Sequence, residues 1–263
     1  MKKQESKPIG RLELQEIAVV PTIDVVVFPH MVVPLLVLDS KIIAGVHQAM
    51  RSDKKVLMLA TKSSLNSYEE EGEPVGVEDL FNLGTVGEII RLMELSDGGV
   101  KILIQGVQKA MVHSLVPTEE TLLAKIELIP AATEDCTPGM RDEYAKKICD
   151  LIARLPVSNT LFSPDFSSIV SQIENPQKMS DFVLSHLNLP VSQAQELLEK
   201  ESISVILDEV VNHLERLVSS SEVEEKIRTS TRDSINKSQR EYYLREQLKK
   251  IKKELGDDAD SDI

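Results

Sequence analysis

The chain has 263 residues, of which 41% are hydrophobic, 28% are charged and 3% are aromatic, with no Trp. This length and composition allow two globular cores and exclude a disordered chain, because enough aliphatic surface is available to bury. The formal net charge of −13 argues against general binding to nucleic acid or to an anionic membrane, since both attract cations.

The amino-terminal end carries no recognisable targeting signal. Residues 1–9 are predicted to form a flexible tail, because the lysines that follow the initial Met lead into polar residues instead of an apolar stretch. The most apolar run, residues 25–38, is interrupted by two prolines and a histidine, so no membrane span is expected. The two cysteines, Cys136 and Cys149, are too few for a disulfide scaffold and favour a cytoplasmic location.

Residues 10–130 are predicted to form a β-rich lobe. Apolar and β-branched runs typical of strands lie at positions 17–20, 23–28, 32–38, 55–61, 85–95, 100–105, 111–116 and 122–129. Asp97, Gly98 and Gly99 separate two of these runs, as in a β-hairpin. Asp39 or Ser40 is expected to cap one helix. About six strands and one helix favour a compact, partly closed sheet with a barrel-like shape.

A polar stretch at residues 63–79 is expected to be a mobile loop. It carries six acidic side chains and no basic one: Glu69, Glu70, Glu71, Glu73, Glu78 and Asp79. The alternative of a metal site is disfavoured, because these residues lack the alternating spacing of a calcium-binding loop. The loop would add a weak attraction for basic polypeptide segments.

A linker at residues 131–139 and an all-helical lobe at residues 140–221 follow. Helix starts are indicated by Thr137-Pro138, Ser163-Pro164 and Asn175-Pro176, by a capping box of Ser192 with Gln195, and by Ser202. Together with the β-rich lobe, these helices predict an α+β fold.

Residues 222–256 are predicted to form one long exposed helix, followed by a polar connector at residues 257–263. About 34 helical residues at about 1.5 Å each give a rod of about 50 Å, which cannot be buried in a small lobe. A narrow apolar seam runs along its end: Leu244, Leu248, Ile251 and Leu255. Such a seam favours weak self-association. Tyr242 and Tyr243 either contact a partner as well or serve as packing residues.

Catalytic, cofactor and metal sites are not predicted. No Gly is followed by Lys, which excludes a phosphate-binding loop of the Gly-Lys-Ser/Thr kind. The five histidines are scattered and no Cys-x-x-Cys is present, which argues against zinc. Cys149 lies beside the apolar face of a predicted helix and is interpreted as a core residue instead of a nucleophile.

Four segments resemble the amino-terminal region of Lon, the ATP-dependent serine protease. They are PTIDVVVFPHMVVPL, GTVGEI, VKILIQG and QREYYLREQL, at residues 21–35, 84–89, 100–106 and 239–248. The sequence departs from the family at His30, where the family usually has Gly after Phe-Pro. His is one of the better-tolerated residues if that position has a positive φ.

The resemblance implies a substrate-binding lobe, a helical lobe, and a long helix that leads into an AAA+ ATPase module and a Ser-Lys protease domain. On this interpretation the chain is not an enzyme by itself, and ATP and magnesium would belong to the downstream module. The resemblance also implies that the partners are unfolded or damaged proteins and that the full-length enzyme is a hexamer. Two alternatives are a freestanding protein-binding adapter and a coiled-coil assembly protein.

A receptor for unfolded segments must recognise apolar side chains or free backbone, because its ligands share no fixed sequence. The apolar run that is interrupted by prolines fits this requirement. We therefore predict a protein-binding site that includes Phe28, Pro29, His30, Met31 and Pro34, with the alternative that Met31 is simply a core residue.

Overall fold

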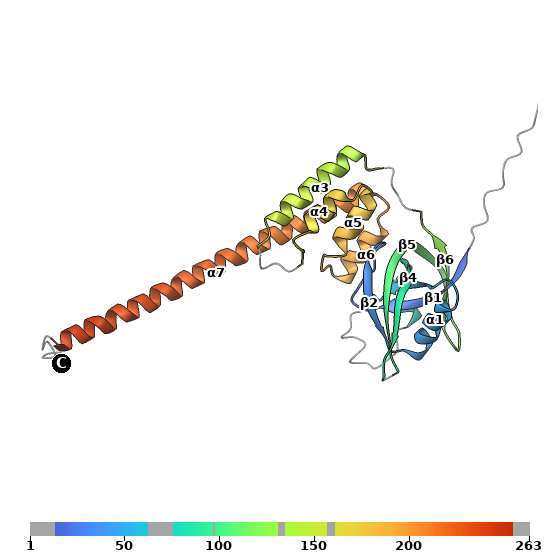
Figure 1. Ribbon diagram of the computed structural model, residues 1–263, viewed down its shortest axis with the longest axis horizontal. Coiled ribbons are helices and arrows are strands. Elements are labelled where there is room, and N and C mark those ends of the chain that lie inside the picture. Colours follow the sequence, from blue (N-terminus) through green and yellow to red (C-terminus); the bar gives the residue numbers. More distant parts are fainter. Residues whose placement is uncertain (1–13, 63–75, 97, 131–134, 157–160, 255–263) are drawn as a thin grey trace, which may run out of the picture.

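The computed structural model describes residues 14–62, 76–96, 98–130, 135–156 and 161–254. Figure 1 shows a β-rich lobe and a helical lobe, from which helix α7 (Ile203–Glu254) extends as a single rod. The α+β fold class is confirmed. No helix in the described part of the chain is long and apolar enough to cross a membrane.

The β-lobe is a small barrel with one extra strand. Its elements are β1 (Gln15–Thr22), β2 (Val32–Val37), α1 (Ser40–Met50), β3 (Lys55–Ala60), a short 3-10 helix η1 (Val77–Asp79), β4 (Leu83–Glu94), β5 (Val100–Pro117) and β6 (Leu122–Leu128). The strand order is β2-β5-β4-β3-β1-β6, and β5 also pairs with β6. Five strands therefore close on themselves, whereas β2 lies outside the closure and pairs with the first part of β5.

Two of the predicted strands differ from the structure. The run at residues 111–116 is not a separate strand but the second half of β5, which passes from its pairing with β2 to its pairing with β6. The run at residues 23–28 is not a strand, because Asp24 has a φ of 60° and turns the chain away from the sheet. Most of the acidic stretch at residues 63–79 lies outside the described residues.

Strand β3 is buried on both faces, as its unbroken apolar sequence predicts. Val56 and Met58 pack on the side covered by α1, and Leu57 and Leu59 pack in a second cluster on the other face. Helix α1 is held in place at its start by Asp39, whose carboxylate accepts hydrogen bonds from backbone N–H groups of the first turn, as expected.

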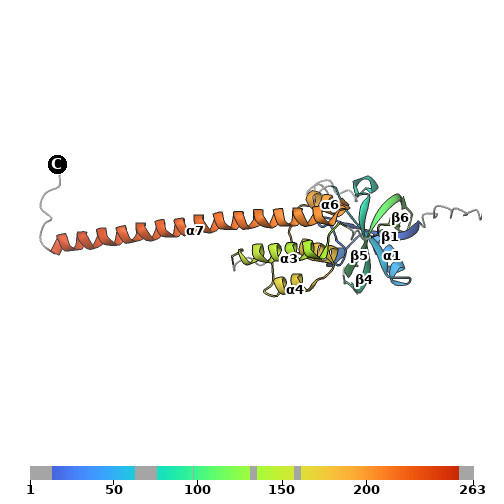
Figure 2. The ribbon, with the colours of Figure 1, turned by 90° about the horizontal axis from the view of Figure 1, so that it is seen from above.

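The helical lobe consists of four helices and the first part of α7. The four helices are α3 (Pro138–Ala153), α4 (Phe166–Gln172), α5 (Pro176–Leu184) and α6 (Val191–Glu199). Helices α3 and α5 pack against α7, α4 packs on α3 and α5, and α6 contacts β4. The side chains of Thr137 and Asn175 cap α3 and α5, which confirms two of the predicted starts. Figure 2 shows α3 alongside the beginning of α7.

The predicted capping box at the start of α6 is wrong. The helix begins at Val191 after Pro190, so Ser192 already lies within its first turn. The Gln195 side chain is buried and donates from Nε2 to the Leu83 carbonyl of the β-lobe at 3.0 Å. The Gln195 side chain therefore forms a contact between the lobes and does not cap the helix.

Helix α7 is continuous from Ile203, directly after the predicted start at Ser202, and the helix predicted from residue 222 is its exposed part. The Asp135 carboxylate accepts a hydrogen bond from the Ile203 N–H at 3.2 Å and so fixes the start of the helix. The helix is packed as far as Val218, which is 1% exposed, and beyond that point nearly all of its described side chains are exposed. The change near residue 222 is thus from packed to exposed helix.

The two lobes share one apolar core. Val26, Phe28, Ala60 and Leu83 of the β-lobe belong to the same buried cluster as the inward faces of α3 to α7. The lobes are therefore held together by a common core, and the segment that precedes β2 packs between them.

Candidate functional site

A tight turn leads into β2. Pro29 occupies its second position, His30 has a φ of 66°, and the Met31 N–H donates to the Phe28 carbonyl at 3.2 Å, which is the pattern of a type II turn. The His30 N–H donates to the Gly106 carbonyl at 2.8 Å, and the Gly106 N–H donates to the Met31 carbonyl at 2.8 Å. A positive φ favours Gly, and His is one of the better-tolerated side chains there.

The five predicted protein-binding residues do not share one surface. Phe28 is 3% exposed and belongs to the core between the lobes, so it is not available to a partner. Pro29 is also buried and Met31 is half-buried, whereas His30 and Pro34 are exposed. The sequence pattern could not tell which side of this segment faces outward.

The outer face of β2 continues across two neighbouring strands as a surface that carries several apolar side chains, with Lys101 and Arg91 among them. Leu36 is opposite Lys101 of β5, and Lys101 is opposite Met93 of β4, so the three side chains form one row. In the adjacent row, Pro34 lies opposite Leu103. We define the apolar surface as Val32, Pro34, Leu36, Leu103 and Met93.

Exposure on this surface is high for aliphatic side chains. Val32 is 49% exposed, Leu36 is 60% exposed and Met93 is 44% exposed. Lys101 lies between Leu36 and Met93, and Gln105 lies opposite Val32, so polar side chains are interspersed among the apolar ones. Exposed aliphatic side chains that gather on one face of a fold are typical of a protein-binding site. The sequence signal was present but missed: β2 and the end of β4 carry apolar residues on both faces of the strand, not only on the face toward the core.

A separate cleft of about 1000 Å³ lies between the two lobes. The β-lobe contributes residues such as His30 and Met111, and the helical lobe contributes residues such as Gln177 and Lys178. Burial and the nearby charge of Lys178 lower the pKa of His30, so its imidazole is neutral at pH 7. Of the predicted site residues, Pro29 and His30 line this cleft.

Polar groups are buried beside the cleft. Lys109 of β5 donates from Nζ to the carbonyls of Leu198 at 2.8 Å and Lys200 at 3.2 Å, at the end of α6. Burial lowers the pKa of Lys109, with Asp181 opposing that shift. Burial raises the pKa of Asp181 to about 7, although the charge of Lys109 acts in the other direction. The Asp181 Oδ2 atom has no hydrogen-bond partner among the described residues.

Asp181→Asn is expected to stabilise the protein near pH 8 by about 2–4 kcal/mol relative to the parent, and to change little near pH 4. The folded pKa of Asp181 lies above its ordinary value of 3.8, so its contribution to stability is present at low pH and lost as the pH rises toward about 7. Because asparagine at this position would no longer attract the charge of Lys109, the stabilisation is expected at the lower end of this range. Urea unfolding of both proteins across this pH range measures the difference; parallel pH profiles would contradict it.

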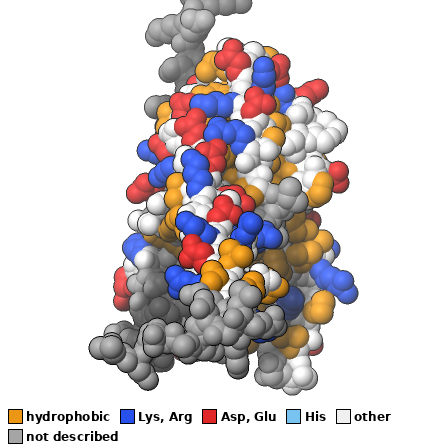
Figure 3. All heavy atoms as spheres, turned by 90° about the vertical axis from the view of Figure 1, so that its left-hand side faces the viewer, with side chains coloured by type: hydrophobic (Ala, Val, Ile, Leu, Met, Phe, Trp, Pro, Cys, Tyr) orange, Lys and Arg blue, Asp and Glu red, His pale blue; other side chains and the backbone are white. Residues whose placement is uncertain are grey.

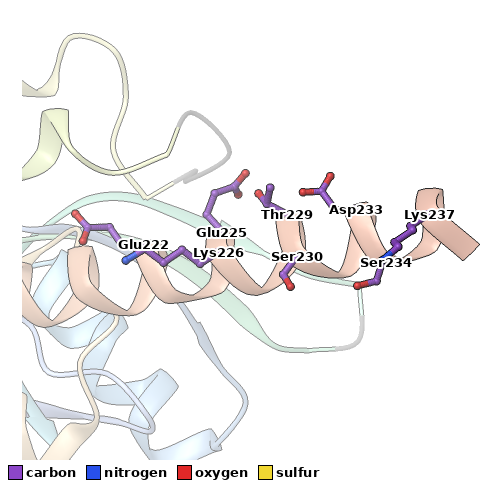
Figure 4. A pocket seen from close by; sticks show the side chains of 8 residues that line it. All are labelled: Glu222, Glu225, Lys226, Thr229, Ser230, Asp233, Ser234 and Lys237. Atoms are coloured by element: carbon purple, nitrogen blue, oxygen red, sulfur yellow. The ribbon is translucent and has the colours of Figure 1, made fainter.

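The exposed part of α7 is polar over most of its length. Eight side chains that border a shallow hollow all project from this one helix, as Figure 4 shows: Glu222, Glu225, Lys226, Thr229, Ser230, Asp233, Ser234 and Lys237. Glu222 pairs with Arg154 at the end of α3 at 2.9 Å. All the side chains that border the hollow belong to α7, so they form a solvated face and not a binding cavity. Figure 3, with α7 pointing toward the viewer, shows basic and acidic side chains interspersed along it.

The predicted contact residues at the end of α7 are exposed. Tyr242 is 69% exposed and Tyr243 is 63% exposed. Leu244, Leu248 and Ile251 of the apolar seam are between 52% and 56% exposed. Leu255 lies outside the described residues. The lobes leave these side chains unburied, so they do not serve as packing residues within this chain.

Possible metal ligands are dispersed over the structure. Within the described ranges, no group of three or more His, Cys, Asp or Glu side chains is arranged to hold a metal ion. The features with functional potential in the described structure are therefore the apolar surface, the cleft and the seam of α7.

Comparisons with known proteins indicate one family. The model of the ATP-dependent protease La (LON) substrate-binding domain matches residues 16–216. The Lon protease of Escherichia coli (strain K12) is 34% identical over 259 residues, which cover 95% of this chain and 31% of that protein. The Lon protease of Rhizobium meliloti (strain 1021) is 33% identical over 242 residues, which cover 92% of this chain and 29% of that protein. The chain thus spans about three-tenths of the length of the curated relatives it matches.

Solved structures share the fold. The N-terminal domain of a Mycobacterium avium complex Lon protease has a TM-score of 0.58 and 18% identity, covering 76% of this chain and 98% of that one. A Lon N-terminal domain protein from Xanthomonas campestris has a TM-score of 0.53 and 12% identity, covering 75% of this chain and 98% of that one. At these identities the likeness concerns architecture alone.

Proposed function

The chain belongs to the family of Lon substrate-binding domains, and we propose on this basis that it selects non-native protein segments for an ATP-dependent protease. The role is one of binding: the region that the family model matches is a substrate-binding domain, not a catalytic one. ATP and magnesium would be used by an AAA+ module, and a Ser-Lys protease domain would cut the peptide. The two free cysteines support a site of action in the reducing cytoplasm.

The apolar surface is the observation that carries this proposal. An unfolded protein differs from a folded one chiefly in exposing aliphatic and aromatic side chains, and a receptor for it needs apolar surface that its own fold leaves uncovered. Val32 and Leu36 of β2 and Met93 of β4 supply that surface. The methionine adapts its shape to different side chains because it has three rotatable bonds.

Replacing Leu36 and Met93 together with serine is expected to weaken binding of an unfolded, aromatic-rich polypeptide by about tenfold or more, since each lost aliphatic contact contributes on the order of 1 kcal/mol. NMR titration of the parent should perturb amide signals of residues 28–36 more than those of residues 140–200. The matched control replaces two exposed aliphatic side chains on other elements, Ile169 and Val205, with serine.

The control should bind as the parent does. Equal weakening in both double variants would show that exposed apolar area in general is responsible. Perturbations confined to residues 140–200 would overturn the assignment of the apolar surface.

The second part of the proposal concerns α7. We infer that the exposed rod connects the substrate-binding lobes to the downstream ATPase module and supports self-association in a hexamer. The exposed seam at Leu244, Leu248 and Ile251 supports this role, because an apolar stripe on a solvated helix is normally covered by another helix.

The double substitution Leu248→Asp and Ile251→Asp is expected to reduce any concentration-dependent association of the chain in analytical ultracentrifugation. Its effect should be modest, because a four-residue seam forms only a marginal contact. The control, Ser238→Asp with Gln247→Asp, adds the same charge to α7 outside the seam. Strong association that survives the seam variant would place the contact elsewhere.

A further inference from the structure

Strand β2 has an open edge. It lies at the end of the strand order and pairs with β5 on one side, and no other element of the described structure pairs with it. Open edges with apolar side chains attract further strands, and proteins usually protect them with charged residues. No charged residue occurs from Met31 to Leu38. Pro34 is the only feature of β2 that opposes strand pairing.

Pro34 reveals which backbone groups face outward. It lies opposite Leu103 within the ladder, yet it has no N–H to contribute. Its nitrogen must therefore face away from β5, and because backbone groups alternate along a strand, the N–H groups of Val32 and Leu36 do the same. The hydrogen bonds of Gly106 with His30 and Met31 agree with this alternation, because they place the Met31 carbonyl on the side of β2 that faces β5.

The outward row of β2 thus presents the N–H groups of Val32 and Leu36 and the carbonyls of Val32, Pro34 and Leu36. None of these five groups has a hydrogen-bond partner among the described residues. The two donors are about 13 Å apart at about 3.3 Å per residue, which corresponds to a span of about five residues. Groups that repeat at this interval match an extended polypeptide backbone.

The same residues also carry the side chains of the apolar surface. Val32, Pro34 and Leu36 point to the exposed face, whereas Val33 and Val37 point into the core. A polypeptide that adds to the edge would continue this face by one strand and place every second side chain beside Leu36 and Val32. Main-chain bonds would supply affinity without regard to sequence, and the apolar row would favour hydrophobic residues at alternate positions.

We propose that the open edge of β2 binds an extended segment of non-native polypeptide as an added strand of the sheet. This inference rests on the proposed function and specifies how the substrate is held. The segment it fits is about five residues long, uncharged, and apolar at every second position. Most strands of folded proteins are already paired, so the edge favours chains whose backbone is free.

The test uses one matched pair of substitutions. Leu36→Ala removes the side chain and keeps the outward N–H, whereas Leu36→Pro also removes the N–H. Because this N–H faces away from β5, the proline leaves the ladder of β2 with β5 intact, as Pro34 already does. The ligand is a neutral eight-residue peptide with alternating valine and threonine, titrated against the full chain by NMR. Slow exchange of the Leu35 and Val37 amides checks that β2 stays paired.

Leu36→Pro is expected to bind the peptide at least tenfold more weakly than Leu36→Ala does. As a second arm, the parent protein is titrated with peptides that are N-methylated at alternate residues, in the two possible phases. One phase should abolish binding and the other should retain it, because only every second N–H of an added strand faces β2. If β2 no longer pairs with β5 in Leu36→Pro, the titration with methylated peptides still tests whether the substrate binds as an added strand.

The following results would contradict binding of the substrate as an added strand. Equal weakening by Leu36→Ala and Leu36→Pro, or equal binding of both methylated peptides, would show that side chains alone hold the substrate, and the proposed function would stand. Unchanged binding of unfolded polypeptide to both Leu36 variants and to the Leu36, Met93 double variant would remove the proposed function as well. Self-association that only Leu36→Pro abolishes would assign the edge to a second copy of the chain.

Discussion

Replacing Phe166 with alanine is expected to lower the free energy of unfolding by about 3–5 kcal/mol, as is usual when a large aromatic side chain is removed from a core. Phe166 is fully buried at the start of α4. Its ring stacks on Phe182 with a centroid separation of 4.9 Å and meets Phe162 edge-on at 4.7 Å. Alanine would leave a cavity between the ring of Phe182 on α5 and the ring of Phe162 in the segment before α4. Because these rings belong to different segments, the lobe cannot easily collapse to fill it.

Urea unfolding followed by circular dichroism measures this loss. Ile169→Ala on the same helix is the control, because Ile169 is 40% exposed and its truncation should cost less than about 1 kcal/mol. A loss for Phe166→Ala no larger than that of the control would show that the aromatic cluster is loosely packed.

The second large effect is expected at Gly106. A Cβ atom at this position would lie 2.3 Å from the carbonyl oxygen of Phe28, which belongs to the backbone of the turn before β2 and cannot rotate away. Gly106→Ala should therefore lower the free energy of unfolding by about 3 kcal/mol, at the upper end of the range for overpacking. It should also release β2 from its bonds to β5 and weaken binding of unfolded polypeptide.

Amide exchange of residues 30–37 and the unfolding free energy measure the two consequences. Gly139→Ala is the control, because nothing lies within 4 Å of its Cβ position in the first turn of α3. That variant should be neutral or slightly more stable, since alanine favours the helix. If the β2 amides exchanged rapidly in both variants, a clash with the Phe28 carbonyl would not be the cause, and the prediction would be contradicted.

Local signals in the sequence were reliable where a short stretch determines its own structure. Asp39, Thr137 and Asn175 each cap the helix that follows them, because a cap depends on residues only two or three positions away. The double-sided burial of β3 was likewise evident from its uninterrupted apolar run.

Errors arose where a distant contact decided the outcome. Gln195 is buried against the Leu83 carbonyl, more than a hundred positions away, so its role in a capping box was an incorrect inference. The extent of β5 was missed because its two halves pair with different strands, and no local pattern reports a change of partner.

The candidate site was only partly predictable. The segment was predicted from its unusual mixture of prolines and aliphatic residues, but the prediction included Phe28, which fills the core. Leu36 and Met93 were missed because they come together only through the register of three strands. An exposed aliphatic residue and a buried one look the same in a sequence until the sheet is assembled.

The length of α7 has a mechanical consequence. Its unpacked part, from Val218 to the end at Glu254, reaches about 50 Å beyond the body at about 1.5 Å per residue. A rotation of about 5° at the packed end would displace the far end by about 5 Å, roughly one strand spacing. Small tilts of the lobes are thus amplified into much larger displacements at the far end of α7, so the rod acts as a lever.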